Sequence, residues 1–81
     1  MASIQQLQGV FVDSLGIPPD TDFGELTYRS VPQWDSVAHM RLVADLEAAF
    51  DVMLDTDDVV DMSGFAVCRT ILGKHGVKFD D

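Results

Sequence analysis

Residues 34–50 read WDSVAHMRLVADLEAAF, and this stretch decides the fold. Its apolar side chains recur at helical spacing and, at about 100° per residue, gather on one side of a helix. They are Met40, Val43, Leu46 and Phe50, flanked by Leu42 and His39. Asp35 is a residue type favoured at the N-cap. We therefore expect a helix over Ser36–Phe50 with this side in the core.

The N-terminal segment predicts a second amphipathic helix. Apolar side chains at spacings of three and four indicate a helix over residues 3–15. They are Ile4, Leu7, Val10, Phe11 and Leu15. Ser3 suits the N-cap of this helix, and Gly16, followed by two prolines, suits its end.

Residues 17–34 show no sustained period and hold all three prolines of the chain, so we expect a long loop. Loops of this length are uncommon in compact domains and are often functional. Phe23, Leu26, Tyr28 and Trp34 are too apolar for a free linker. We expect several of them to pin the loop onto the core, with Trp34 as a loop anchor rather than a binding platform.

The C-terminal third predicts one short helix and one longer helix. Acidic residues at 55–58 suit the positive end of a helix dipole. Val59, Val60 and Met62 would give this third helix its apolar contacts over about two turns. Ser63 then suits the N-cap of a fourth helix. Its inner side would carry Phe65, Cys68, Ile71 and Leu72, its C-terminal end Lys74 and His75, and Gly76 would break it.

These segments predict an all-α fold. No alternating β-branched run is bounded by hairpin turns. We expect a single domain over residues 1–81, a small four-helix bundle with three longer helices and one short helix. The long loop would lie between helices one and two. The acidic tail after residue 79 is expected to be frayed.

The composition excludes several function classes. Fourteen acidic residues against five basic ones give a net charge of −9, which disfavours nucleic acid and anionic membranes and favours partners with basic docking surfaces. The single cysteine excludes an internal disulfide, and the two histidines lack zinc-ligand spacing. No stretch is long and apolar enough to span a membrane, and residues 1–8 do not resemble a secretory signal. We expect a cytoplasmic monomer without a metal site.

The chain resembles the acyl carrier protein family. The similarity is carried by Trp34-Asp35-Ser36-Val37, then by His39-Met40-Arg41-Leu42-Val43, and by Leu46-Glu47-x-x-Phe50. It covers nearly the whole chain, including helix order, loop placement and acidic bias. The attachment motif of the family is Asp-Ser-Leu, which here reads Asp-Ser-Val. This version of the motif is most similar to freestanding carriers of specialised pathways.

The resemblance implies that Ser36 carries a 4'-phosphopantetheine arm donated by coenzyme A through a phosphopantetheinyl transferase. Acyl groups would ride on the arm as thioesters and be presented to acyl-loading and acyl-processing enzymes of a polyketide or modified fatty-acid pathway. It also implies that Asp35 helps to bind the metal of the transferase, which is compatible with capping. A serine in the first turn of a helix suits a phosphodiester, because helix N-termini favour anions.

A second serine matches the family triplet better by letters. Asp13-Ser14-Leu15 reads Asp-Ser-Leu, yet Ser14 falls at the end of the first helix, where the dipole is negative. No recognition helix follows it. We therefore expect no attachment at Ser14.

The outward side of the second helix is expected to bind partners. It carries Val37, Arg41, Ala44, Asp45 and Ala48, and Asp57 and Asp58 add negative charge from the third helix. Val37 is either an edge-of-core residue or an exposed apolar anchor, and its position away from Leu46 favours the anchor. Fatty-acid carriers of this family present acids along the outward side of this helix, whereas this chain shows Val37, Arg41, Ala44 and Ala48. If this side is functional, we expect weak docking to fatty-acid synthase enzymes. Scattered charges on a solvated face are the alternative.

The remaining reactive residue types predict packing rather than catalysis. His39 lacks a nucleophile and an orienting acid at suitable spacing, so we expect a partly buried residue near the arm. Cys68 is expected to pack, and Met40, Met53 and Met62 predict an adaptable core. An enzyme is therefore disfavoured. The alternatives to an acyl carrier are an aminoacyl or peptidyl carrier and a helical adaptor without an arm.

Overall fold

The computed structural model describes residues 2–79, and within them the chain forms four α-helices, as predicted. These are α1 (Ile4–Leu15), α2 (Ser36–Phe50), α3 (Thr56–Asp61) and α4 (Phe65–Lys74). The long loop before α2 also contains a 3₁₀ helix, η1 (Phe23–Glu25), which the sequence pattern did not predict. The expected frayed tail, Asp80 and Asp81, lies outside the described residues. None of the helices within residues 2–79 has the length and apolarity needed to cross a bilayer.

Local capping explains where the first two helices begin and end. The Ser3 side chain accepts a hydrogen bond from the Gln6 amide at 3.0 Å, which satisfies one unpaired donor of α1. Gly16 ends α1 with a φ of 69°, a left-handed conformation that glycine adopts without steric cost. The Asp35 carboxylate caps α2 by accepting from the Ala38 amide at 2.9 Å. These three caps are confirmed.

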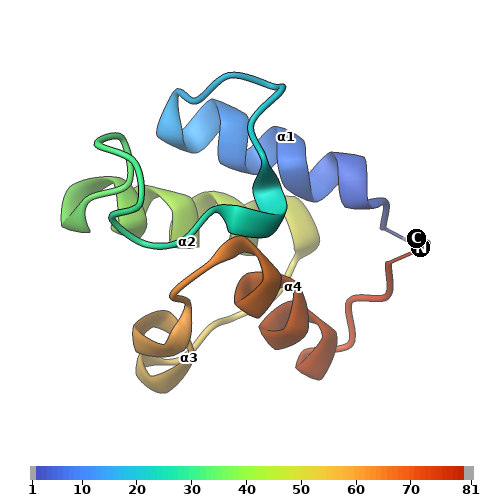
Figure 1. Ribbon diagram of the computed structural model, residues 1–81. Helices are drawn as coiled ribbons and strands as arrows, with labels where there is room; N and C mark the ends of the chain where they lie inside the picture. Colours follow the sequence, from blue (N-terminus) through green and yellow to red (C-terminus); the bar gives the residue numbers. More distant parts are fainter. Residues whose placement is uncertain (1, 80–81) are drawn as a thin grey trace.

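The helices α1 and α2 run in roughly opposite directions, with the other two helices packed beside them (Figure 1). Gln6, near the start of α1, lies beside the end of α2, while Ser14, near the end of α1, bonds to Asp45. Ala2 and Lys78 lie side by side on one side of the molecule, where the Ala2 amide donates to the Lys78 carbonyl at 2.9 Å. Because α2 ends on that side, its first residue lies at the opposite end of the bundle.

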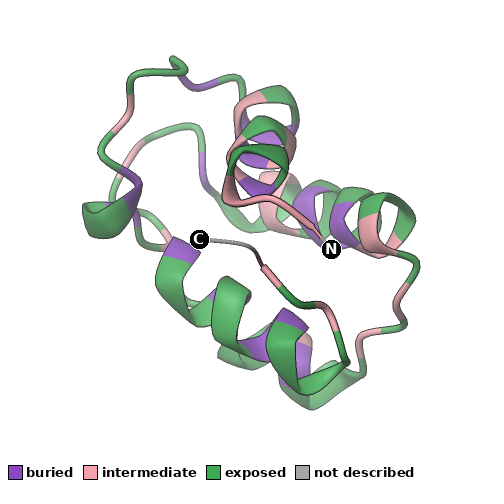
Figure 2. Cartoon of the chain, turned by 90° about the vertical axis from the view of Figure 1, so that its right-hand side faces the viewer, coloured by how far each residue is buried: buried purple, intermediate pink, exposed green. Residues whose placement is uncertain are grey.

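A core of aromatic and aliphatic side chains joins all these segments, and Figure 2 shows the buried positions turned inward along the helices. Phe11 of α1 packs edge to face against both Trp34 of the loop and Phe65 of α4, with ring centroids 5.5 and 5.0 Å apart. Phe23 of η1 meets Phe65 at 5.0 Å. The predicted pinning of the loop is therefore confirmed, since Phe23, Leu26 and Trp34 are buried.

The predicted core side of α2 was partly wrong. Leu42, Val43 and Leu46 are buried, but Met40 is 60% exposed and Phe50 is half-buried. Met40 lies about 120° around the helix from Leu46, which is too far to share its buried direction. Phe50 ends the helix and packs instead against Phe79, with ring centroids 5.8 Å apart.

The expected methionine core and the expected contacts of α3 also need correction. Among the methionines assigned to an adaptable core, only Met62 is buried, because Met53 lies in the exposed connection before α3. Val60 is 74% exposed, whereas Val59 is half-buried. A helix of less than two turns can bury only one narrow side, and here that side is filled by Val59 and by Asp58.

The predicted cap of α4 at Ser63 was wrong, since Gly64 is the N-cap and makes no side-chain hydrogen bond. The backbone of the loop performs this role instead. The Phe65 amide donates to the Leu26 carbonyl at 2.9 Å, and the Tyr28 amide donates to the Ser63 carbonyl at 2.8 Å. A Cβ at position 64 would lie 3.2 Å from the Leu26 carbonyl oxygen, so this close approach favours glycine.

One side-chain hydrogen bond ties α3 to the end of α4. His75 Nε2 donates to Asp58 Oδ2 at 2.6 Å, and Asp58 is 7% exposed. The backbone of Asp58 is held as well, because its amide donates to the carboxylate of Asp55, the N-cap of α3, at 2.8 Å. The hydrogen bond from His75 lowers the pKa of Asp58 below its ordinary value of 3.8, and partial burial opposes this shift.

Asp58→Asn is expected to destabilise the fold in a pH-dependent way. Because the folded pKa of Asp58 is lowered, its contribution is fully present above 3.8 and is lost as the pH falls through the folded pKa. The urea midpoint of the variant should lie below that of the wild type at about pH 5, and the gap should narrow at about pH 3. Asp57→Asn, at an exposed neighbour, should show no such narrowing. If the difference in urea midpoint between the wild type and Asp58→Asn stays constant with pH, this would contradict the lowered pKa of Asp58.

Candidate functional site

Ser36 is exposed and is the first residue of α2, whose N-terminal end lies away from Ala2 and Lys78. Its neighbour Asp35 is engaged as the N-cap of the same helix. The first turn of α2 contains no acidic side chain, so the carboxylate at the positive end of the helix dipole is that of the Asp35 cap. The position therefore combines an accessible hydroxyl with an environment that favours an anion.

The exposure of Ser36 depends on the burial of the residue two positions before it. Trp34 is 0% exposed, and its ring packs edge to face against Phe11 and Tyr28. Its backbone is held as well, because its carbonyl accepts from the Arg29 amide at 3.1 Å. With Trp34 fixed in the core, the chain turns outward at Asp35 and α2 starts at the surface.

His39 joins three segments around this site. Trp34 Nε1–H can only donate, so His39 Nδ1, 3.0 Å away, must accept. The ring proton then lies on Nε2, which donates to the Val59 carbonyl of α3 at 2.9 Å. His39 is half-buried, as predicted, and both of its ring nitrogens serve structure rather than acid–base chemistry.

An apolar pocket of about 240 Å³ lies one helical turn from Ser36, between α2 and α3. It is lined by Tyr28, His39, Val59, Val60, Met62 and Ser63. The sequence pattern missed this pocket, since Val60 and Met62 were both expected to fill the core. No sequence signal marked the pocket, because the exposure of Val60 is known only from the structure.

The structure separates the residues that were expected to bind partners. Val37 is 79% exposed, and Arg41, Ala44 and Ala48 are exposed with it on one side of α2. Asp45 is also exposed, at the edge of this side.

The two acids expected to contribute from α3 differ. Asp57 is exposed in the first turn of α3. Asp58 is buried against His75, so its carboxylate is not presented at the surface. The reason is helical geometry, since adjacent residues point about 100° apart and only one of the two can face solvent here.

Ser14 is enclosed, in contrast to Ser36. It is 6% exposed, and its hydroxyl donates to Asp45 Oδ2 at 2.5 Å. The serine whose local sequence is Asp-Ser-Leu is thus engaged in packing α1 against α2. Ser36 is exposed at the start of α2, whereas Ser14 is buried near the end of α1 and bonded to Asp45.

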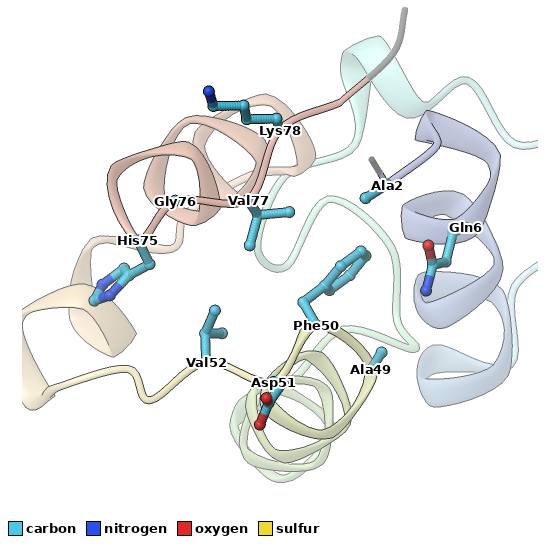
Figure 3. A pocket seen from close by; sticks show the side chains of 10 residues that line it. All are labelled: Ala2, Gln6, Ala49, Phe50, Asp51, Val52, His75, Gly76, Val77 and Lys78. Atoms are coloured by element: carbon cyan, nitrogen blue, oxygen red, sulfur yellow. The ribbon is translucent and has the colours of Figure 1, made fainter.

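A second and larger hollow of about 610 Å³ lies at the other end of the bundle, beside Ala2 and Lys78 (Figure 3). Phe50, Val52 and Val77 point toward its centre, while the Lys78 side chain extends away from it. It is separated from Ser36 by the length of α2, about 22 Å for fifteen residues. The hollow therefore belongs to a different region from the candidate site.

The chain was compared with protein-family models, with curated proteins and with solved structures, and none of the three comparisons found a match.

His39→Leu is expected to lower the free energy of unfolding by about 1–3 kcal/mol, because the buried indole N–H of Trp34 would lose its acceptor. The measurement is urea unfolding followed by circular dichroism. Met40→Leu, one residue away on the exposed side, should change the free energy by less than about 0.5 kcal/mol. Equal effects of the two substitutions would show that the Trp34–His39 bond contributes nothing.

Cys68 is expected to be unreactive in the folded chain. It is fully buried, and desolvation raises the pKa of its thiol to about 12. At about pH 8 roughly one thiol in ten thousand would be ionised. A disulfide reagent such as DTNB should therefore titrate no thiol in the native chain without a prosthetic arm, and one thiol in guanidinium chloride. Rapid reaction of the native chain would show that α4 opens readily.

Proposed function

We propose that this chain is a carrier protein that bears a 4'-phosphopantetheine arm on Ser36. The observation that carries the proposal is the exposed hydroxyl at the first residue of α2, held outward by the buried Trp34. The sequence resemblance around residues 34–50 supports the same residue.

The residues around Ser36 fit the arm. A phosphodiester on Oγ would meet the N-terminal end of a fifteen-residue helix, whose amides and dipole favour negative charge. Asp35 is held by the Ala38 amide, so its carboxylate is directed into the helix cap. When attached, the arm supplies a terminal thiol that holds acyl groups as thioesters.

Attachment is a phosphoryl transfer for which this chain supplies only the nucleophile. Ser36 Oγ forms a bond to the β-phosphorus of coenzyme A, and the bond to the adenosine bisphosphate breaks, so that this group leaves. The hydroxyl proton passes to a base of the phosphopantetheinyl transferase. The transferase also provides magnesium, which suits a reaction dominated by positioning and charge neutralisation.

The pocket between α2 and α3 favours acyl over aminoacyl cargo. Its walls include Val59, Val60 and Met62, and His39 offers no free ring nitrogen because both are already bonded. Such a surface suits a hydrocarbon segment, whereas an ammonium group there would lose part of its hydration against walls whose side-chain hydroxyls come from Tyr28 and Ser63 alone. The carrier would thus deliver acyl intermediates of a specialised polyketide or fatty-acid pathway to loading and processing enzymes.

Co-expression with a broad-specificity phosphopantetheinyl transferase tests the proposal. Intact mass spectrometry should show one added phosphopantetheine on the wild type and none on Ser36→Ala. Ser14→Ala is the matched control and should be modified like the wild type, because Ser14 is enclosed and bonded to Asp45. A wild-type chain that stays unmodified would instead indicate an adaptor that works through protein contacts alone.

A further inference from the structure

The acids of α2 are committed to contacts within the chain. Asp35 caps the helix, and Asp45 accepts the Ser14 hydroxyl. Glu47 accepts the Leu54 amide at 2.8 Å, which holds the connection to α3. In each of these carboxylates one oxygen is already used in a hydrogen bond within the chain. The acidity of the chain is therefore a poor guide to what α2 presents to a partner.

One exposed stripe of α2 is free of acids. It consists of Val37, Met40, Arg41, Ala44 and Ala48, which we call the α2 stripe. At about 100° per residue these five positions fall within an arc of about 100°, and they extend for about 17 Å along the helix. All five are exposed. Val37 and Met40 are among the exposed large hydrophobic residues of the chain, at 79% and 60%. The stripe begins directly after Ser36.

Arg41 is the single charge of the α2 stripe, and it is uncommitted. Within residues 2–79 its guanidinium makes no hydrogen bond, ion pair or ring contact with another residue. This differs from Arg29, which lies over the Tyr28 ring. An unpaired guanidinium beside an exposed valine and methionine suits a carboxylate, because its planar donor fork matches two carboxylate oxygens.

We propose that the α2 stripe docks an apolar helix of a partner protein that places a carboxylate opposite Arg41. This inference rests on the proposed carrier function, since a partner seated there would lie beside the arm on Ser36. Val37 and Met40 would supply the buried apolar area, and Ala44 and Ala48 would allow a helix to approach closely. Arg41 would set the register.

The charge of the partner is therefore constrained in two places, directly opposite Arg41 and around the contact. Opposite Arg41 an acid is favoured, because the pair would be partly desolvated at the centre of the contact. Around the contact, the net charge of −9 and the exposed Asp57 and Asp61 favour neutral or basic groups. A uniformly basic docking surface would place a cation against Arg41, which is a mismatch.

Two synthetic helical peptides test this surface. Both carry the same leucine stripe and neutral flanks, and they differ in one central residue, glutamate or glutamine. Binding to the isotope-labelled chain is measured by NMR at about 0.15 M salt, where screening acts over about 8 Å. Both peptides should shift the amides of residues 37–48. The wild type should bind the glutamate peptide more tightly than the glutamine peptide. The dissociation constant of the glutamine peptide divided by that of the glutamate peptide should fall about threefold or more in Arg41→Gln, as for an exposed ion pair.

Lys78→Gln is the matched control, because it removes the same charge at the other end of the bundle. It should leave the ratio unchanged. The proposal is overturned if neither peptide shifts residues 37–48, or if Arg41→Gln leaves the ratio unaltered. It is also overturned if the same amides shift with protein concentration in the absence of peptide, since a second copy would then occupy the stripe.

The two experiments distinguish a failure of the docking surface from a failure of the carrier function. A chain that accepts phosphopantetheine on Ser36 but shows no Arg41-dependent ratio retains the carrier function and loses this docking surface. A chain that shows the ratio but is never modified retains the surface and loses the arm.

Discussion

The structure depends on the burial of Trp34 and on the hydrogen bond that satisfies its indole. A fully buried indole N–H needs an acceptor, and His39 provides it from the first full turn of α2. His39 in turn donates to the Val59 carbonyl, so the same imidazole fixes the nearest helix. One aromatic side chain and one imidazole thus position the long loop, α2 and α3 relative to each other. No disulfide is available to do this in a chain with one cysteine.

The same constraint creates the candidate site. Because Trp34 points inward, the chain must reverse direction at Asp35, and Ser36 emerges at a helix tip with its hydroxyl in solvent. His39, which accepts the indole N–H of Trp34, also donates to the Val59 carbonyl and lines the apolar pocket of about 240 Å³ beside the tip. The exposed serine and the apolar pocket are therefore both adjacent to the Trp34–His39 pair.

Helix boundaries and buried aromatic side chains could be predicted from the sequence because both depend on local spacing and capping. Ser3 and Asp35 are caps in the structure, and Trp34 is a loop anchor. The errors arose where a contact distant in sequence decides the outcome. Gly64 caps α4 only because the backbone at Leu26 approaches it, and no local pattern carries that information.

The side of a helix that faces the core is similarly difficult to predict at its margins. A period of 3.6 residues identifies a buried direction, but it does not say how wide an arc the neighbouring elements cover. For α2 that arc covers the buried Leu42, Val43 and Leu46 and excludes Met40, which is 60% exposed. The acids show the same dependence on tertiary contacts, since Asp57 and Asp58 are adjacent and identical in type, yet one is exposed and the other is bound to His75. A net charge therefore describes the whole chain, whereas the charge that a partner meets is determined by which acids the fold has already used.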